Sequence, residues 1–151
     1  MRLTATREIH RPADEVFAFF ADASHNPKWQ EGMVSCRWTT PPPIGVGSVY
    51  EQHAKFMGRD VQSVFRVTEF DPGRSIKIET VESTFPITVH RTVHTTGPGT
   101  SRVHADIGGG PTGLLRLLAP LMKGKAQKSV DADYDRLKDL LDRPDGINKE
   151  S

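Results

Sequence analysis

The sequence of 151 residues lacks most of the features that identify metal, redox or nucleotide chemistry. It contains one cysteine, Cys36, which excludes an intramolecular disulfide and any metal site built from several cysteines. It has no zinc-binding His-Glu-x-x-His and no nucleophile elbow. The run Gly108-Gly109-Gly110 has neither of the spacings of phosphate-binding glycine loops. We therefore expect neither a cofactor nor a bound metal.

The sequence also has almost no net charge and no long apolar run. The 20 basic and 19 acidic side chains leave a formal net charge of +1, which offers no field to attract nucleic acid. No apolar run approaches the roughly 20 residues that span a bilayer. The N-terminus carries no apolar signal region. These absences predict a cytoplasmic protein with no nucleic-acid partner and no integral membrane association.

The order of the patterns that are present is informative. Residues 2–10 alternate with a period of two, and from Pro12 the period changes to that of a helix with Val16, Phe17, Phe19 and Phe20 on its apolar face. A short helical turn over 22–27 follows. Six further strand patterns are predicted over residues 34–40, 48–56, 61–70, 75–82, 87–96 and 102–107. Tight turns separate the later strands, so the pattern favours an antiparallel meander.

A long helix is predicted over residues 112–141, with Pro120 and Gly124 weakening it near its start. Its apolar positions include Leu118, Leu121 and Met122 before the weakened region, and after it a stripe of Val130, Tyr134, Leu137, Leu140 and Leu141. The last residues, 143–151, are polar and are expected to be a disordered tail. We therefore expect one domain over residues 1–142.

The sequence resembles the START-like superfamily, also called the Bet v 1-like or polyketide cyclase/dehydrase group. The resemblance extends from Leu3 to about Leu141 and rests on four phrases. They are T-A-T-R-E-I-H-R-P-A-D-E-V-F-A-F-F-A-D from Thr4, N-P-K-W from Asn26, V-T-E-F-D-P-G-R-S-I from Val67, and D-A-D-Y-D-R-L-K-D-L-L from Asp131.

The resemblance implies an α+β helix-grip fold. In that fold a seven-stranded antiparallel sheet curves around a long C-terminal helix, and two short helices follow the first strand. Members of the superfamily bind lipids, sterols, polyketides, hormones or quinones in the cavity, and some catalyse cyclisation or dehydration. No catalytic motif is common to all members, so the resemblance implies a cavity but no particular reaction.

Arg91 is the main candidate for a polar group in this cavity. It shares a strand face with Val89 and Val93, the face expected to point inward. A buried arginine needs a partner, either a carboxylate such as Glu51 or Glu69 or an acidic or carbonyl group of a ligand. The alternative is that Arg91 lies near the sheet end and extends outward to solvent.

The strand that contains Tyr50 and His53 mixes polar and apolar residues on both faces. Such a strand either lines a cavity and orients a ligand, or lies exposed at a sheet edge. Tyr50, His53 and Arg91 are the candidates for catalysis.

The remaining predicted cavity residues are aromatic or aliphatic. Two of them, Trp29 and Trp38, could stack on a flat ligand or simply pack in the core. The others are predicted to form the wall: Phe65, Val67, Ile78, Val89, Leu118 and Met122.

Three histidines, His90, His94 and His104, are predicted on the opposite, polar face of the sheet. A symmetric hairpin turn over 97–100 would place His94 opposite His104 and Thr92 opposite Asp106. This face is interpreted as a solvent-exposed surface, and a metal or pH-sensitive site is the alternative.

Three functions remain open. The first is a carrier that sequesters a hydrophobic small molecule in an internal cavity. The second is a polyketide cyclase or dehydratase in which Arg91 or Tyr50 polarises a carbonyl and His53 moves protons. The third is a co-chaperone-like interaction module that uses the sheet surface. The sequence allows a homodimer without requiring one.

Overall fold

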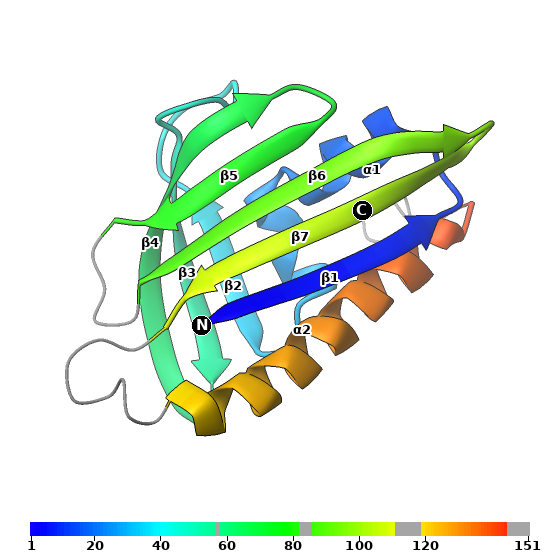
Figure 1. Cartoon of the computed structure of the whole chain (residues 1–151). Helices are drawn as coiled ribbons and strands as arrows, with labels where there is room; N and C mark the ends of the chain where they lie inside the picture. The colour runs from blue at the N-terminus through cyan, green and yellow to red at the C-terminus, as the bar shows by residue number, and fades with distance from the viewer. Residues whose placement is uncertain (57, 82–85, 111–118, 145–151) are drawn as a thin grey trace.

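A computed structural model describes residues 1–56, 58–81, 86–110 and 119–144 of the chain. Two short helices, α1 (Ala13–Phe20) and the 3₁₀ helix η1 (Ala23–Lys28), follow the first strand, and a long helix, α2 (Ala119–Asp142), lies near the C-terminus (Figure 1). The seven strands are β1 (Arg2–Ile9), β2 (Met33–Trp38), β3 (Val49–Phe56), β4 (Arg59–Asp71), β5 (Ser75–Thr80), β6 (Ile87–Gly97) and β7 (Thr100–Gly109).

All seven strands form one antiparallel sheet in the order β1-β7-β6-β5-β4-β3-β2. Every strand from β2 to β7 pairs with its neighbour in the chain, which confirms the predicted meander. β1 pairs with β7 and forms the other edge of the sheet. The sheet, the two short helices and the C-terminal helix confirm the predicted helix-grip fold.

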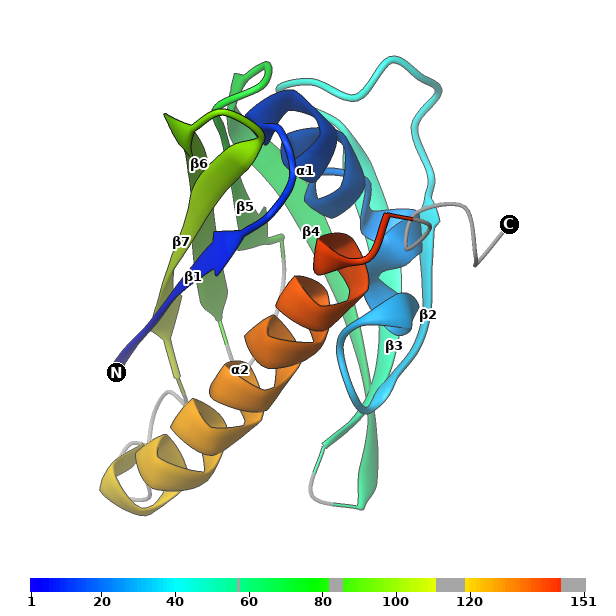
Figure 2. The same cartoon turned by 90° about the vertical axis from the view of Figure 1, so that its right-hand side faces the viewer.

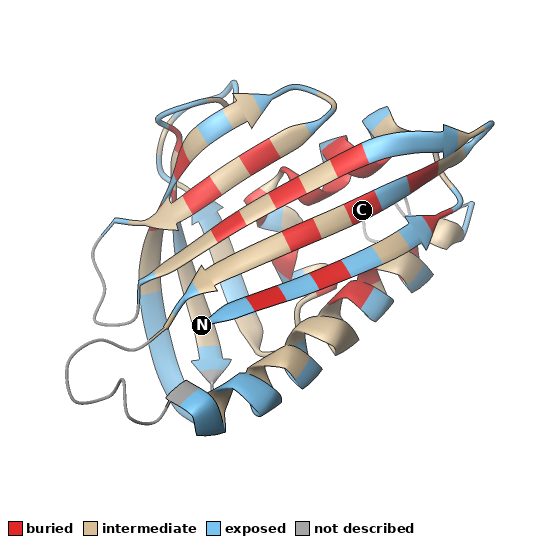
Figure 3. Cartoon of the chain, viewed as in Figure 1, coloured by how far each residue is buried: buried red, intermediate tan, exposed pale blue. Residues whose placement is uncertain are grey.

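The inner face of the sheet is apolar because side chains alternate between the two faces of each strand. On β6, Val89, Arg91 and Val93 are buried, and on β7, Val103 and Ala105 are buried (Figure 3). The short helix α1 adds its predicted apolar face to this core, with Val16, Phe17, Phe19 and Phe20 buried.

Helix α2 runs along the open side of the curved sheet (Figure 2). Its buried residues near the C-terminal end are Tyr134, Leu137, Leu140 and Leu141. Polar bonds tie the helix to β1, including Arg7 Nε to Asp135 Oδ1 at 2.7 Å. None of the described helices could span a membrane, because each is too short or too polar.

The described part of α2 begins at Ala119 and includes Pro120 and Gly124. Leu121 was predicted on an apolar face but is 79% exposed, so the sheet does not cover this position of the helix. The predicted helical residues 112–118 and most of the predicted tail lie outside the described residues.

The register of the β6–β7 hairpin also differs from the prediction. His94 lies opposite Arg102, and Thr92 lies opposite His104. The connection is the two-residue turn Pro98-Gly99, and an irregularity between Thr95 and Gly97 shifts the pairing. The pairing partner of each residue differs from the prediction by two residues. Because side chains alternate with a period of two, the histidines remain on the predicted face of the sheet.

Candidate ligand-binding cavity

Two adjoining pockets lie between the sheet and α2. The inner pocket has a volume of about 140 Å³ and is lined by Asn26, Trp29, Gln30, Tyr50, Gln52, Phe65, Ile78, Ile87, Val89, Arg91, Ile107, Val130, Asp133 and Tyr134. The outer pocket has a volume of about 180 Å³ and is lined by Met1, Leu3, Ile87, Ile107, Gly108, Gly109, Gly110, Met122, Ala126, Ser129 and Val130. Ile87, Ile107 and Val130 border both pockets, so the two adjoin.

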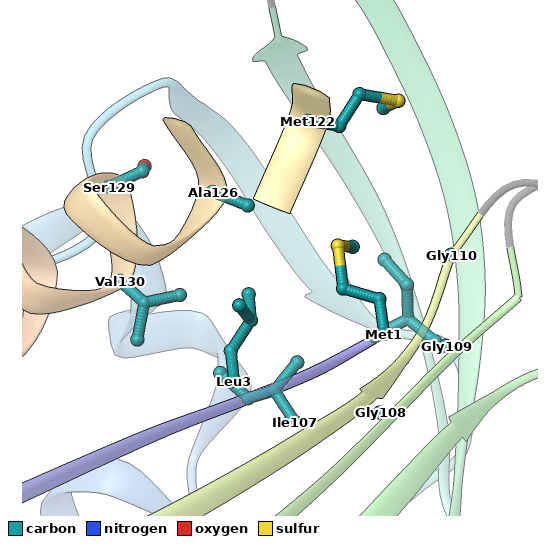
Figure 4. A pocket seen from close by; sticks show the side chains of 11 residues that line it. Met1, Leu3, Ile107, Gly108, Gly109, Gly110, Met122, Ala126, Ser129 and Val130 are labelled. Carbon is teal, nitrogen blue, oxygen red and sulfur yellow. The ribbon is translucent and has the colours of Figure 1, made fainter. Parts of the chain in front are cut away.

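The outer pocket is almost entirely apolar. Figure 4 shows Met122, Ala126 and Val130 of α2 on one side and Leu3 of β1 on the other. Ser129 is the one polar side chain among its lining residues. This pocket can therefore contact the apolar part of a ligand and offers little to a polar part.

Arg91 lines the inner pocket and is its basic side chain. It is only 7% exposed, and its Nε donates a hydrogen bond of 2.7 Å to the hydroxyl of Tyr134. The guanidinium carbon lies 5.1 Å from the centroid of the Trp29 ring, within the range of a cation–π interaction. An arginine side chain stays protonated in proteins, so the pocket holds a buried positive charge.

Three buried polar atoms beside this charge have no hydrogen-bond partner within the described part of the chain. They are the indole nitrogen of Trp29, the amide nitrogen of Gln30 and the amide oxygen of Asn26. Buried polar atoms are normally paired, because an unmet hydrogen bond costs about 1–3 kcal/mol. All three residues line the inner pocket, so a ligand there could supply the missing partners.

Besides Arg91, two ionisable groups that line the inner pocket have shifted pKa values. Burial raises the pKa of the Tyr50 hydroxyl, so this group stays neutral and can donate a hydrogen bond at ordinary pH. Burial also raises the pKa of Asp133, and it outweighs the hydrogen bonds that this carboxylate accepts from Arg136 and from the backbone N–H of Glu31.

The structure corrects the prediction for His53. Tyr50 and Gln52 point inward from β3, and His53 takes the opposite face because adjacent residues alternate. Its Nε2 lies 3.3 Å from Oδ1 of Asp60, and neither pocket includes it. His53 is therefore not placed to move protons in the cavity.

The predicted carboxylate partners of Arg91 are also wrong. Glu51 pairs with Arg37 at 2.9 Å, and Glu69 pairs with Lys77 at 3.3 Å. Both acids lie away from the inner pocket, and the hydroxyl of Tyr134 takes the place that a carboxylate was expected to fill.

The other predicted cavity residues divide into three groups. Trp29, Tyr50, Phe65, Ile78, Val89 and Arg91 line the inner pocket, and Met122 lines the outer pocket. Val67 is fully buried but lines neither pocket. Trp38 lines neither of the two but borders the small adjoining gap beside Tyr50 and Arg91, and it donates its indole N–H to Asp22 at 2.8 Å. Leu118 lies outside the described residues.

Several lining residues were not predicted. Tyr134 was recognised only as part of the apolar stripe of α2, although it is the one residue of that stripe with a polar end. Asn26 and Gln30 flank the predicted Trp29, but nothing in their spacing indicates that their amides point inward. Gln52 shares the inward face of β3 with Tyr50, a signal that strand alternation could have provided.

The histidine face carries local contacts. Nδ1 of His104 lies 2.8 Å from the hydroxyl of Thr6, and His90 lies opposite Asp106. Within the described residues, no three histidine, cysteine or acidic side chains gather closely enough to hold a metal ion.

The sequence of the chain matches a family model over residues 1–142, and the description of that family is polyketide cyclase/dehydrase and lipid transport. The chain belongs to this family.

Solved structures of other proteins share the fold of this chain. The protein TTHA0849 from Thermus thermophilus has a TM-score of 0.80 and 17% identity, with 100% of both chains covered. A START superfamily protein from Mycobacterium smegmatis has a TM-score of 0.80 and 14% identity, with 93% of this chain and 96% of that chain covered.

An aromatase/cyclase from Streptomyces sp. R1128, Zhui, has a TM-score of 0.78 and 14% identity, with 95% of this chain and 94% of that chain covered. At these identities the likeness concerns the fold. No curated protein matches the sequence.

Proposed function

We propose that this protein binds a hydrophobic small molecule between the sheet and α2, as a carrier or sequestering protein. The observation that carries the proposal is the pair of adjoining pockets, one apolar and one built around the buried Arg91. An apolar cavity with a few convergent polar groups is the usual form of a small-molecule site. Membership of a family that includes lipid transport supports the same proposal.

The test is a matched pair of substitutions. Val130→Trp would place a large ring at the border of both pockets, and Val34→Trp makes the same change at a 50% exposed position that lines neither. Native mass spectrometry and titration with the neutral dye Nile red would measure ligand occupancy. We expect Val130→Trp to lose at least about tenfold in affinity for the dye, the equivalent of about 1.4 kcal/mol.

We expect Val34→Trp to bind like the original protein. Equal binding by both variants would show that the dye does not enter these pockets, and it would contradict the proposal. Circular dichroism would establish that both variants are folded before affinities are compared.

A second candidate function is catalysis of a cyclisation or dehydration. The Arg91–Tyr134 hydrogen bond favours it, because a tyrosine hydroxyl that accepts from arginine keeps its own O–H to donate to a substrate carbonyl. With His53 outside, Asp133 is the remaining proton acceptor in the pocket. Loss of water from a ketide thioester, followed by mass spectrometry, would distinguish an enzyme from a carrier.

The third alternative, an interaction module without a ligand, is less well supported, because pockets lie between the sheet and α2.

A further inference from the structure

We propose that the ligand is an amphiphilic monocarboxylate, with its carboxylate at Arg91 and its apolar body directed into the outer pocket. This inference rests on the proposed function and names the chemical class of its ligand. Three features of the inner pocket carry it: a buried cation without an ion pair, an excess of unpaired donors, and the position of the one acidic residue among the lining residues.

No acidic side chain in the described part of the chain pairs directly with Arg91, although Asp133 in the same pocket favours its charge from farther away. No ion pair there includes this guanidinium. Its contacts are a phenol, Tyr134, and an aromatic ring, Trp29, and neither carries a negative charge. A buried cation is stable when an anion accompanies it, so the pocket favours an anionic ligand.

The unpaired groups are mainly donors. Arg91 has five N–H donors, and only its Nε donates to a described residue. The indole N–H of Trp29 and the amide N–H of Gln30 are buried without an acceptor among the described residues. A carboxylate has acceptor oxygens and no donor, and its geometry matches the two-pronged guanidinium.

Asp133 limits the ligand to a single negative charge. It lines the same pocket, and its carboxylate is held by Arg136 and by the N–H of Glu31 rather than by Arg91. A phosphate or dicarboxylate would bring a second negative charge near Asp133 with no second cation among the lining residues. An amine would be repelled by Arg91. A monocarboxylate pairs with Arg91 and brings no second negative charge near Asp133.

The outer pocket offers the apolar part of the ligand far more space than the small gap of about 10 Å³ that also adjoins Arg91. The outer pocket adjoins the inner one at Ile87, Ile107 and Val130, and its remaining walls include Leu3 and Met122 (Figure 4). An aliphatic or aromatic group attached to the carboxylate would reach these walls. The cavity therefore matches an amphiphile rather than a small polar acid.

The experiment compares three probes that share one chain: octanoate, octan-1-ol and octylamine. Isothermal titration calorimetry or displacement of Nile red gives their affinities for the full-length protein. We expect octanoate to bind about tenfold or more tightly than octanol, because hydrogen bonds to a charged carboxylate are stronger than those to a neutral hydroxyl. Octylamine should bind most weakly.

Two variants locate the carboxylate. Arg91→Met keeps an unbranched, although shorter, side chain and removes its charge, and it should lower octanoate affinity about tenfold while octanol affinity stays within about twofold. Trp29→Phe keeps an aromatic ring but removes the unpaired N–H together with part of the indole surface, so it should weaken octanoate binding severalfold more than octanol binding even if Arg91→Met fails to fold.

The outcomes separate the two proposals. If octanol binds as tightly as octanoate, the carboxylate head group is overturned and the hydrophobic cavity stands. An octanoate affinity that is unchanged in both variants would also overturn it. If none of the three probes binds and Nile red binds equally to Val130→Trp and Val34→Trp, the cavity function is overturned as well.

Discussion

After α1, the carboxylate of Asp22 accepts three hydrogen bonds. Two come from Ser24, from its backbone N–H at 3.0 Å and its hydroxyl at 2.7 Å, and the third comes from the indole of Trp38 at 2.8 Å. Burial alone would raise the pKa of Asp22, but the bonds from Ser24 and Trp38 outweigh it and the pKa is lowered. This one residue caps η1 and joins it to β2.

Asp22→Asn should lower the free energy of unfolding by about 1–2 kcal/mol at pH 7, because charge-assisted hydrogen bonds are replaced by neutral ones. A carboxylate with a lowered pKa in the folded state stabilises the protein above its unfolded pKa of about 4. That contribution is lost as pH falls through the folded-state pKa. Urea unfolding at pH 7 and at pH 3 should therefore show a deficit that shrinks in acid.

Asp139→Asn is the matched control. Asp139 is exposed, and its carboxylate takes part in no ion pair or hydrogen bond with a described residue. We expect its effect to be below about 0.5 kcal/mol at both pH values. A deficit for Asp22→Asn that stays constant from pH 7 to pH 3 would contradict the assigned role of the charge.

At the scale of elements, two glycines have opposite roles. Gly109 ends β7 with a φ of +119°, and a Cβ at this position would lie 2.0 Å from the carbonyl oxygen of Pro86. Gly124 is exposed in the first half of α2, and a Cβ there would have nothing within 4 Å. The first glycine is required by close approach of the chain, and the second is not.

Gly124→Ala should raise the free energy of unfolding by about 1 kcal/mol, since alanine is favoured over glycine in a helix by about that amount. Gly109→Ala should lower it by more than about 1 kcal/mol, because the native backbone is incompatible with a side chain. Thermal and urea unfolding would measure both. A neutral Gly109→Ala would mean that this strand end is not packed as described.

The whole molecule depends on α2 completing the core. The sheet is curved and one-sided, so its apolar face must be covered by a helix. Leu137 and Leu141 are fully buried against it, and Arg136 ties the helix to the backbone of Trp29 with a hydrogen bond of 3.0 Å. The same helix supplies Val130, Asp133 and Tyr134 to the inner pocket. The inner pocket therefore forms only when α2 packs against the sheet.

Two leucines of α2 test this dependence. Leu141→Ala removes a fully buried side chain and should lower the free energy of unfolding by about 2–5 kcal/mol. Leu121→Ala makes the same change at a 79% exposed position and should stay within about 0.5 kcal/mol. Similar losses for the two variants in urea unfolding would contradict the described packing of α2.

Much of this architecture was predictable because it depends on local periodicity. Alternation predicted the seven strands and the inward face of Val89, Arg91 and Val93. Turn details were less accessible: the shift in the β6–β7 hairpin depends on one irregularity between Thr95 and Gly97. Such an irregularity leaves no periodic pattern.

The candidate site was predictable only in part. Strand alternation allowed two choices for the strand of Tyr50 and His53, and the tertiary structure placed Tyr50 inside and His53 outside. Local sequence does not specify which of two mixed faces meets the core. That depends on what packs against the strand.

The sequence by itself determined the fold class, the order of the elements and the presence of a positive charge on the inner face of β6. These follow from the spacing of apolar residues and from the alternation of side chains along a strand. Only the tertiary structure decided what surrounds that charge. Tyr134 lies 43 residues beyond Arg91 in the chain, and the two meet because α2 folds back across the sheet. Contacts between distant segments are set by packing, and they make the buried arginine a candidate ligand site.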